Sequence, residues 1–329
     1  FTEEEVYQQY VSNLQKYNST QWYFYSNQSN LSIGNYGYST CASDSNGNEN
    51  CTQERVVSVL EAPDTTGPSI EFVPPTYINN TNLTYGVNNS ALVNVSASDV
   101  EGNVSSFIDF DDSVVMWMRM DEVDGSGNPV DYFGEINGSL IGNVNTTTGG
   151  KLGDRAQFDE TLDYISLTET ITFDNAEEWS ISYWANGEGA IFGKNEVANT
   201  IWHWEGGSRL RILNNDSTVT DLNSFSNFYE WKYYTLVFDG TNVKAYLNAE
   251  NIQNATTGSE FAINNIGDAH STDWLNFSGS IDDVIIFNRS LSAEEIESLY
   301  GNSSSKVVSS IFTELGVGDH TMKAYAQDN

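Results

Sequence analysis

From residue 67 onward, apolar and polar residues alternate with a period of two. In the segment ALVNVSA, for example, Val93, Val95 and Ala97 fall on one side of an extended chain. Clusters of Gly, Asn and Asp separate such runs, and these residues favour turns. The pattern predicts an all-β fold of short antiparallel strands over 67–329.

Residues 1–62 have a different pattern. The run TEEEVYQQYVSNLQKY combines a capping box of Thr2 and Glu5 with apolar residues at helical spacing, so it predicts an amphipathic helix of about four turns. The segments WYFYS and RVVSVLEA that follow are typical of hairpin strands, and the linker EAPDTTGP ends this region. The tyrosines of the helix either pack into a core or form an intersubunit surface.

The only cysteines, Cys41 and Cys51, bracket the polar loop CASDSNGNENC. Two thiols ten residues apart, with turn-forming residues between them, predict a disulfide that closes a hairpin. A metal-binding pair is less favoured, because no His or third Cys lies nearby in the sequence. Disulfides persist in oxidising compartments, so this pair indicates an extracellular protein.

Acceptors of the form Asn-x-Ser/Thr occur about twice as often as the roughly seven that chance placement gives. The excess predicts a glycosylated cell-surface protein. The alternative is a Ser-, Thr- and Asn-rich β-protein that scatters such triplets among its turns. The acceptors are Asn18, Asn27, Asn30, Asn50, Asn79, Asn82, Asn88, Asn94, Asn103, Asn137, Asn145, Asn215, Asn254, Asn276, Asn288 and Asn302.

The chain carries 13 Lys and Arg against 46 Asp and Glu, a net charge of −33. A field of this sign repels polyanions, which argues against nucleic acid as a partner. No apolar run approaches the roughly 18 residues of a membrane helix, so we expect no membrane insertion by this segment. Salt adaptation and cation binding both produce such an imbalance, and composition does not choose between them.

Two flanking segments carry distinctive strands, VNVSASD in residues 67–111 and HTMKAYAQDN in residues 302–329. Together they resemble one immunoglobulin-like domain of the kind repeated in archaeal and bacterial surface proteins. The resemblance implies that the two flanks pair across an insertion.

The insertion, residues 112–301, contains alternating strands and an Asp/Gly-rich loop. Its informative segments are VVMWMRMDEVDGSGNPVDYFGEINGSLIG, KLGDRAQFDETLDYISL, WSISYWANGEGAIFGK, WKYYTLVFDGTNVKAYLNAE and GSIDDVIIFNRSLSAEEIESLYG. They resemble a laminin-G-like or concanavalin-A-like jelly roll, which implies two antiparallel sheets packed face to face. In the last segment Ser292 and Glu295 form a capping box and Gly301 ends a short helix.

Concanavalin-A-like folds include glucan hydrolases, which place Glu-x-Asp-x-Glu along one strand so that two carboxylates flank the glycosidic bond. The nearest match here, Glu122-Val-Asp124, lacks the third carboxylate and lies in a turn-rich stretch. The sequence has no Gly-x-Ser-x-Gly elbow, and its histidines, His203, His270 and His320, fit surface or packing roles. We therefore expect no enzymatic activity.

Calcium is the better supported chemistry, because Ca²⁺ takes roughly six to eight oxygen ligands and Asp-rich loops supply them. Domains of the resembled family often hold calcium between an early Asp loop and the Asp of the closing strand. That resemblance implies Asp131 with Asp282 and Asp283, and Asp121 and Asp124 are neighbouring candidates.

The loop Asp131-Tyr132-Phe133-Gly134-Glu135 departs from the family pattern Asp-x-Ser-Gly-Asn. The calcium site is therefore either degraded or rebuilt around Glu135. The alternative is that these Asp residues form turns without a metal.

Jelly rolls of the resembled kind usually bind ligands through an exposed aromatic residue and polar loops. Trp202, Trp204 and Trp274 are candidates for stacking against a sugar ring. Because Trp202 and Trp204 alternate with His203, the favoured expectation is that this pair lines the sandwich core. Trp274 lies in the polar run HSTDWLNFSG. It is therefore the candidate ligand-binding residue.

Two function classes follow. The first is an extracellular, glycosylated structural or adhesive surface protein that assembles with copies of itself into a filament or layer. The alternative is the carbohydrate-binding region of a larger secreted or surface protein, which binds surface glycans or another cell's surface.

A route to assembly follows from the resemblance. The resembled immunoglobulin-like domains continue past the AYAQDN strand into one more strand, and its absence leaves an edge that is a template for strand addition. We expect residues 1–62 of one copy to dock on this edge of the next copy and so build a filament. The alternative is a longer native polypeptide that supplies the strand itself.

Overall fold

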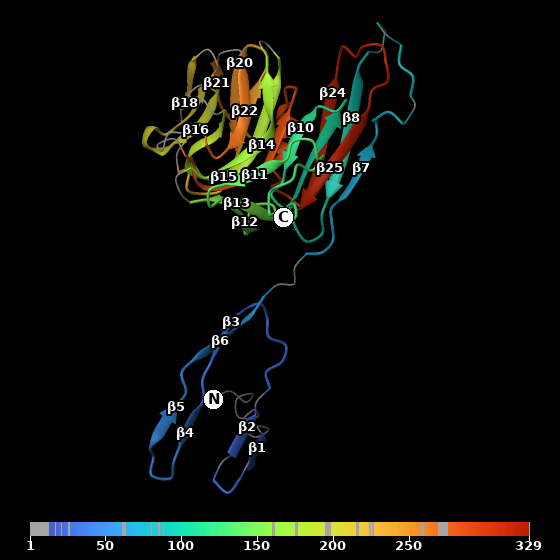
Figure 1. Ribbon diagram of the computed structural model, residues 1–329. Helices are drawn as coiled ribbons and strands as arrows, with labels where there is room; N and C mark the ends of the chain where they lie inside the picture. The colour runs from blue at the N-terminus through green and yellow to red at the C-terminus, as the bar shows by residue number, and fades with distance from the viewer. Residues whose placement is uncertain are drawn as a thin grey trace. The chain divides into compact units, whose positions relative to one another are not determined.

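The computed structural model contains two units, residues 1–65 and residues 66–329 (Figure 1). The structure describes the whole chain except residues 1–12, 17, 21, 26, 61–63, 80, 85, 88, 160–161, 175–176, 195–198, 215–216, 224, 226, 258–259, 269–275 and 329.

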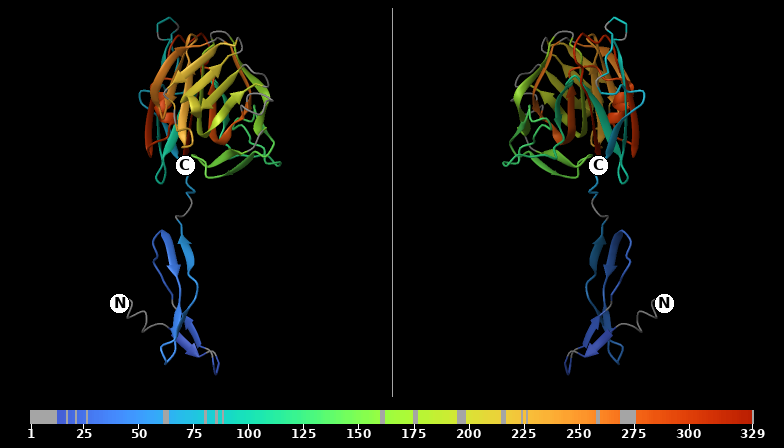
Figure 2. Two further views of the ribbon diagram at one scale, coloured as in Figure 1. Left: turned by 90° about the vertical axis from the view of Figure 1, so that its left-hand side faces the viewer. Right: turned by 90° about the vertical axis from the view of Figure 1, so that its right-hand side faces the viewer.

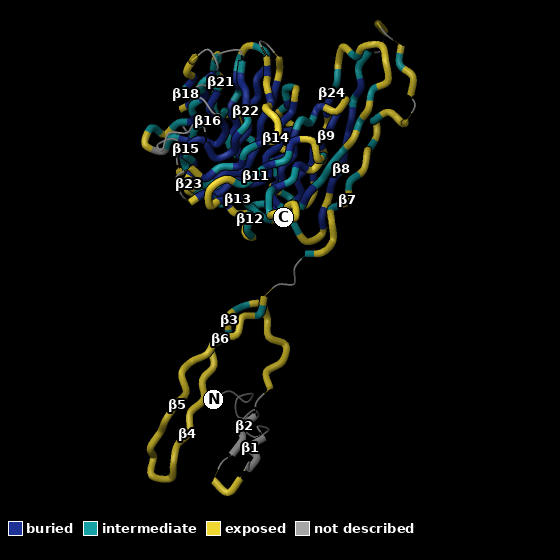
Figure 3. Tube along the Cα trace, in the orientation of Figure 1, coloured by how far each residue is buried: buried dark blue, intermediate teal, exposed yellow. Residues whose placement is uncertain are grey.

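The first unit consists of antiparallel two-stranded ribbons. They pair β1 (Asn13–Lys16) with β2 (Trp22–Tyr25), β3 (Gly34–Tyr38) with β6 (Arg55–Val59), and β4 (Cys41–Ser43) with β5 (Glu49–Cys51). The side chains described in this unit are exposed or half-buried, and none is buried (Figure 3). Its described residues therefore form no hydrophobic core of their own.

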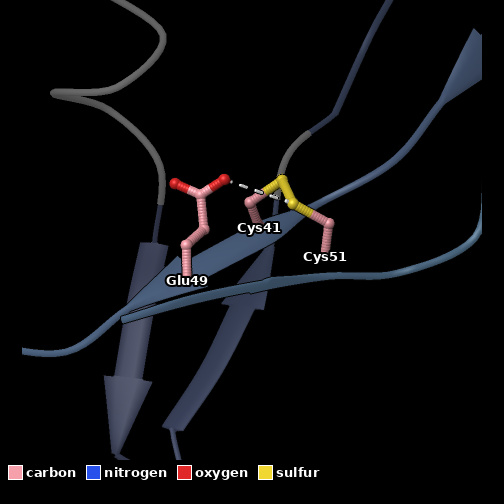
Figure 4. A group of neighbouring side chains, drawn as sticks. All are labelled: Cys41, Glu49 and Cys51. Atoms are coloured by element: carbon pink, nitrogen blue, oxygen red, sulfur yellow. Dashed lines mark hydrogen bonds between the residues drawn. A yellow bond between two sulfur atoms is a disulfide. The ribbon is translucent and has the colours of Figure 1, made fainter. Parts of the chain in front are cut away.

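The predicted disulfide is confirmed. Cys41 and Cys51 lie opposite each other across β4 and β5 and are bonded through their sulfur atoms, beside Glu49 (Figure 4). Asp44 closes the intervening turn, because its Oδ1 accepts hydrogen bonds from the backbone N–H groups of Asn46 and Asn48. The bond therefore closes a hairpin, as the spacing of the cysteines predicts.

The predicted N-terminal helix falls mostly on residues 1–12, which lie outside the described residues. Its last turn is wrong, because Asn13–Lys16 form the strand β1 and pair with β2. The sequence of β2, WYFY, has high strand propensity. Pairing with such a strand outweighs the local helical period.

In the second unit, strands of the two flanks pair with each other. β8 (Ala91–Ser98) lies between β7 (Ser69–Val73) and β24 (Ser305–Phe312), and β9 (Val104–Phe110) pairs with β25 (Met322–Asp328). The two small sheets enclose a core of Ala91, Val93, Val95, Ile108, Phe110 and Val308. The assignment of these flanks to the immunoglobulin-like class stays a prediction.

Between the flanks, two antiparallel sheets share one long strand, β15 (Trp179–Gly193) (Figure 2). Its first part pairs with β19 (Lys232–Phe238) and β23 (Ser278–Phe287). Its last part pairs with β16 (Thr200–Trp204) and β22 (Phe261–Ile266). The all-β jelly-roll class is confirmed.

Shorter strands complete both sheets. The first sheet also contains β10 (Val114–Met118), β12 (Asn145–Thr148), β13 (Asp154–Phe158), β20 (Asn242–Leu247) and β21 (Glu250–Thr256). The second sheet also contains β11 (Gly138–Ile141), β14 (Tyr164–Phe173), β17 (Arg209–Leu213) and β18 (Val219–Asn223). A 3₁₀ turn, η1 (Glu205–Gly207), joins β16 to β17.

The core of this sandwich is aromatic and aliphatic. Trp179, Tyr183, Phe192, Phe238 and Phe261 are among its largest buried side chains. Burial of each such side chain contributes roughly 1.5–3 kcal/mol relative to exposure. The sandwich is therefore the stable frame that carries the sites described below.

One short helix, α2 (Ala293–Leu299), follows the closing strand β23. The predicted capping box is present: Ser292 Oγ accepts from the Glu295 backbone N–H, and a Glu295 carboxylate oxygen accepts from the Ser292 N–H. The same carboxylate pairs with Arg289, 2.7 Å between Oε1 and NH2. Among the described residues, no helix is long and apolar enough to cross a membrane.

Candidate functional site

A buried acidic cluster forms where β23 carries two adjacent aspartates. Between the pairs Ser182–Ile285 and Trp184–Asp282, β23 has one residue more than β15, which is a β-bulge. Asp283 lies in this bulge with a φ of 49°. Bulges re-aim side chains, and this one holds Asp282 and Asp283 buried side by side, at 0% and 1% exposure.

Only one of the two carboxylate oxygens of Asp282 accepts hydrogen bonds from the protein. Its Oδ2 accepts hydrogen bonds from the backbone N–H groups of Lys151 and Leu152, at 2.6 and 2.9 Å. Its Oδ1 is buried and accepts no hydrogen bond. Burial, followed by the charge of Asp283, raises the pKa of Asp282 well above its usual range. The cluster therefore disfavours a second or third negative charge unless a cation offsets it.

Asp121 and Asp283 complete the cluster. Asp121 Oδ1 accepts from the Asp154 N–H at 2.7 Å, and burial raises the pKa of Asp121. Asp283 Oδ1 accepts from Trp117 Nε1 at 2.7 Å, and burial raises the pKa of Asp283 to about 7. At Gly153, where φ is +86°, a side chain would overlap Asp121. The glycine lets the loop close over the cluster.

The carboxylates of the other two predicted metal ligands, Asp131 and Asp124, accept hydrogen bonds from backbone N–H groups. Asp131 is buried, and its two carboxylate oxygens accept N–H bonds from Trp117, Glu135 and Ile136. Asp124 is exposed and caps its own turn through the N–H groups of residues 126 and 128. The structure thus gathers Asp121, Asp282 and Asp283, and leaves Asp131 and Asp124 as turn-forming residues.

The expectation that Trp202 and Trp204 line the core is wrong. Their neighbours Ile201 and His203 are buried in the sandwich, whereas both tryptophans are half-buried on the opposite, outer side of β16. The sequence places the pair on one face but does not say which face is inside. His203 occupies the inside because the core supplies partners for its ring nitrogens.

Burial keeps His203 neutral, and the core supplies neighbours for both of its ring nitrogens. Tyr183 Oη lies 2.9 Å from His203 Nε2, and the Gly187 carbonyl lies 3.4 Å from Nδ1. Burial, the largest effect, lowers the pKa of His203 to about 3. The ring is a packing residue between Phe228 and Tyr234.

The outer side of β16 to β18 carries a set of residues that we call the Trp–Arg face. Trp202 and Trp204 stack with ring centroids 5.4 Å apart and planes 11° apart. Cross-strand register puts Arg211 opposite Trp202 and Arg209 opposite Trp204. Asp221 on β18 lies opposite Arg211. Side chains from three strands thus share one half-buried surface.

Ion pairs and ring contacts fix this face. Arg209 Cζ lies 4.8 Å from the Trp204 ring centroid, and Arg211 Cζ lies 5.2 Å from it. Asp221 Oδ2 accepts from Arg209 NH1 at 2.8 Å and from Arg211 NH2 at 3.0 Å, and Oδ1 accepts from Arg211 Nε at 2.6 Å. Sequence reasoning missed the arginines, although the alternation in RLRIL signals that both point the same way.

The structure describes only some of the remaining candidate residues. Trp274, the predicted ligand-binding residue, lies outside the described residues, as does His270. His320 pairs with Asp111 in the flanking domain, 2.6 Å between Nδ1 and Oδ2. A separate depression of about 660 Å³ is lined by Thr170, Thr172, Phe173, Glu177, Glu178 and Asn288 among others.

The asparagine acceptors differ in their exposure. Asn94 is 9% exposed, and its Nδ2 donates to the Pro74 carbonyl. Asn103, Asn137 and Asn276 are half-buried. Asn88 and Asn215 lie outside the described residues. The exposed acceptors are Asn18, Asn27, Asn30, Asn50, Asn79, Asn82, Asn145, Asn254, Asn288 and Asn302.

Comparison with known families identifies the type of the sandwich domain. Residues 159–297 match the family described as the concanavalin A-like lectin/glucanases superfamily, of the Laminin_G_3 type. This match supports the concanavalin A-like type that the sequence resemblance implies for the sandwich. No curated protein matches the chain.

Several solved structures are similar to part of the chain. The binding domain of Paraclostridial Mosquitocidal Protein 1 is 16% identical, with a TM-score of 0.44 over 58% of this chain and 52% of that one. Domain 4 of AbnA, a GH43 extracellular arabinanase from Geobacillus stearothermophilus solved with arabinotriose, is 17% identical, with a TM-score of 0.44 over 57% and 98%. The botulinum neurotoxin serotype D ligand-binding domain, solved with N-acetylneuraminic acid, is 15% identical, with a TM-score of 0.42 over 58% and 51%. The match thus spans about half the length of the first and third of these structures.

Proposed function

We propose that the chain is the carbohydrate-binding region of a secreted or surface protein, and that the Trp–Arg face of its concanavalin A-like domain binds the glycan. The observation that carries the proposal is this face itself. It presents two tryptophans, two guanidinium groups and a carboxylate on the outer side of a sheet, where solvent reaches them. A family that groups lectins with glucanases is in accord with it.

The chemistry of sugars explains why such a face suits them. A sugar ring offers apolar C–H groups beside hydroxyl groups, so its sites combine aromatic side chains with fixed donors and acceptors. In the Trp–Arg face, the ion pairs with Asp221 hold both guanidinium groups in place. Groups that are already ordered lose less conformational entropy when a ligand binds. We expect no catalysis at this face.

A glycan array tests the proposal. The native chain should bind a defined subset of glycans, and the variant Trp202→Ala/Trp204→Ala should lose that binding while it keeps its unfolding midpoint within a few degrees. Val307→Ala is the matched control, because Val307 is 68% exposed on β24, in the flanking part of the unit. Failure of the native chain to bind any glycan would contradict the proposal.

We also propose that the acidic cluster holds one Ca²⁺ ion. The observation that supports this proposal is Asp282 Oδ1, which is buried with no hydrogen-bond partner. The carboxylates of Asp121 and Asp283 are near enough to influence its charge or each other's. Carboxylate oxygens are the ligands that Ca²⁺ prefers. Asp121, Asp282 and Asp283 would hold the ion, and it would neutralise the cluster and lock the loop around Gly153 onto β23.

A second candidate function is assembly of copies into a filament or layer, with the chain as an extracellular, glycosylated structural or adhesive protein. One supporting observation lies at the edge of the flanking sheets. Phe72 lies opposite the buried Val95 on the core side of β7, yet it is 46% exposed. In the described residues, β25 pairs only with β9. This edge offers both backbone hydrogen bonds and an apolar contact to an added strand.

The first unit supplies the other observation. Its ribbon exposes Ile33, Val56 and Leu60, at 63%, 63% and 79%. Such a surface is costly in water unless something covers it. Strand addition of this ribbon, from one copy, to the β25 edge of the next copy would cover both surfaces.

Deletion of residues 1–62 tests the assembly. The native chain should sediment as oligomers that grow with concentration, and the truncated chain should sediment as a monomer. A truncated chain that assembles as well as the native one would exclude strand donation by this segment. A native chain that stays monomeric would exclude assembly altogether.

Glycosylation is tested separately by the intact mass of native material. That mass should exceed the mass calculated from the sequence, because we expect glycans on exposed acceptors such as Asn82 and Asn302.

A further inference from the structure

The two arginines of the Trp–Arg face retain donors that the protein does not use. Arg209 donates from Nε to the Gly207 carbonyl and from NH1 to Asp221, and no hydrogen bond from its NH2 is present among the described residues. Arg211 donates from Nε and NH2 to Asp221, and its NH1 likewise makes no hydrogen bond there. A guanidinium group has five N–H donors. Both groups therefore keep N–H donors for a ligand.

The Trp–Arg face gathers basic side chains, which are scarce in this chain. The whole chain has 13 basic residues and a net charge of −33. On the Trp–Arg face, two guanidinium groups share the single carboxylate of Asp221, which leaves one positive charge. Glu188 lies on the neighbouring strand β15, and its carboxylate accepts a hydrogen bond from Tyr229 Oη at 2.6 Å. We call this local excess of guanidinium groups the basic spot, and it favours an anion beside the arginines.

The geometry around the arginines favours a planar anionic group. The side chains of Arg209 and Arg211 are 29% and 26% exposed, so solvent reaches them while the tryptophan rings and Asp221 hold them. Arginine donates to carboxylates through two parallel N–H groups, and such charge-assisted bonds are roughly twice as strong as neutral ones. The adjacent rings of Trp202 and Trp204 contribute an apolar surface for the rest of the sugar.

We propose that the glycan bound at the Trp–Arg face carries a carboxylate, which Arg209 and Arg211 hold. This inference rests on the proposed glycan-binding function and narrows it to acidic sugars. Hexuronic acids and sialic acids share this chemistry. The basic spot thus makes the site selective among glycans that would otherwise present similar hydroxyl groups.

Calorimetric titration with matched sugars tests the inference. The probes are a hexuronic acid oligosaccharide, the same oligosaccharide with its carboxyl groups reduced to alcohols, and a sialylated glycan beside its desialylated form. The native chain should bind one acidic member at least about tenfold more tightly than its neutral partner, as expected for charge-assisted hydrogen bonds. That preference should shrink as the salt concentration rises from about 50 to about 500 mM, because salt screens the attraction between the carboxylate and the guanidinium groups.

Variants then assign the preference to the arginines. Arg209→Gln/Arg211→Gln should reduce it to near unity, and Arg209→Lys/Arg211→Lys should retain part of it, because lysine keeps the charge without the planar fork. Lys244→Gln is the matched control, since Lys244 lies on β20 in the other sheet and pairs with Asp239.

The outcomes separate the two proposals. If acidic and neutral partners bind equally and the Trp202→Ala/Trp204→Ala variant loses both, the glycan site stands and the acidic preference is excluded. If neither sugar of any pair binds, and the glycan array is empty as well, both proposals fail. If the acidic preference persists in the Arg→Gln variant, another basic group holds the carboxylate and the inference is overturned.

Discussion

Single residues in this protein take their roles from which face of a strand they occupy. On β16, a one-residue step separates His203, which is 1% exposed inside the sandwich, from Trp202 and Trp204 outside it. Hydrophobicity alone predicts the reverse. The histidine is accommodated because Tyr183 and the Gly187 carbonyl satisfy its ring nitrogens, and an unpaired buried polar group would be costly.

The buried histidine makes stability depend on acid. The pKa of His203 is about 3 in the folded chain and 6.5 when exposed. Between these values the unfolded chain takes up the proton and the folded chain does not, so the free energy of unfolding falls as pH decreases from 6.5 towards 3. The loss attributable to this residue is up to about 4–5 kcal/mol.

Urea unfolding at pH 7 and pH 4 checks this dependence. The control is His203→Phe, which keeps an aromatic ring beside Phe228 and Tyr234 but cannot take up a proton. The carboxylates titrate in both proteins. The native chain should therefore lose more free energy of unfolding between pH 7 and pH 4 than the variant does, and the difference reports on His203. An equal loss of unfolding free energy in both proteins would show that His203 does not cause the acid dependence.

The acidic cluster gives a second prediction about single residues. Added Ca²⁺ should raise the unfolding temperature of the native chain, and EGTA should reverse the rise, because an ion that binds only the folded state stabilises it by mass action. The gain is about 2.7 kcal/mol at a hundredfold excess over the dissociation constant.

Two Asp→Asn substitutions locate that ion. Asp282→Asn should abolish the calcium response, because it removes the negative charge and replaces one of the two carboxylate oxygens by an NH2 group, which cannot bind a cation. Asp124→Asn should leave the response intact, because Asp124 is exposed and caps its own turn. A native chain whose unfolding temperature ignores both calcium and EGTA would contradict the metal site.

The acidic cluster also shows how far the sequence predicts a site. The adjacent Asp282 and Asp283 are visible as candidates, but the bulge that buries both depends on pairing with β15, which is far away in the chain. Asp131 matches the same pattern, yet backbone N–H groups take both of its oxygens. The sequence shows which residues could bind a metal. Whether a carboxylate oxygen is left free to do so depends on the tertiary structure.

At the scale of secondary elements, local signals succeed where all their partners are local. The capping box of Ser292 and Glu295 needs only four consecutive residues, and α2 begins as predicted. The disulfide needs only the hairpin between two cysteines that are ten positions apart. The end of the predicted N-terminal helix fails, because β1 takes its hydrogen bonds from β2 rather than from its own turn.

The helix cap supplies the prediction at this scale. Ser292→Ala should lower the free energy of unfolding by about 1 kcal/mol, since the substitution leaves the Glu295 N–H without its acceptor. Ser292→Asp should restore most of the stability, because Asp is an equally good cap. Guanidinium unfolding monitored by fluorescence measures both. Equal stability of all three proteins would show that the cap contributes nothing.

At the scale of the whole molecule, the interrupted flank is the feature that sequence reveals best. The strands of 67–111 and 302–329 pair in register, Val95 opposite Val308 and Ile108 opposite Ala324. The resemblance of these short distinctive strands to an immunoglobulin-like domain implies this pairing. The Trp–Arg face is beyond such reasoning, since it joins residues of three strands whose outer side only the fold defines.

The location of a bound glycan tests the central claim most directly. A crystal structure of the chain with the tightest ligand from the array should show the sugar against Trp202, Trp204 and Arg211, with a carboxylate facing the arginines. A sugar bound instead in the depression beside Glu177 and Glu178, or a ligand that leaves the outer side of β16 to β18 bare, would contradict the account.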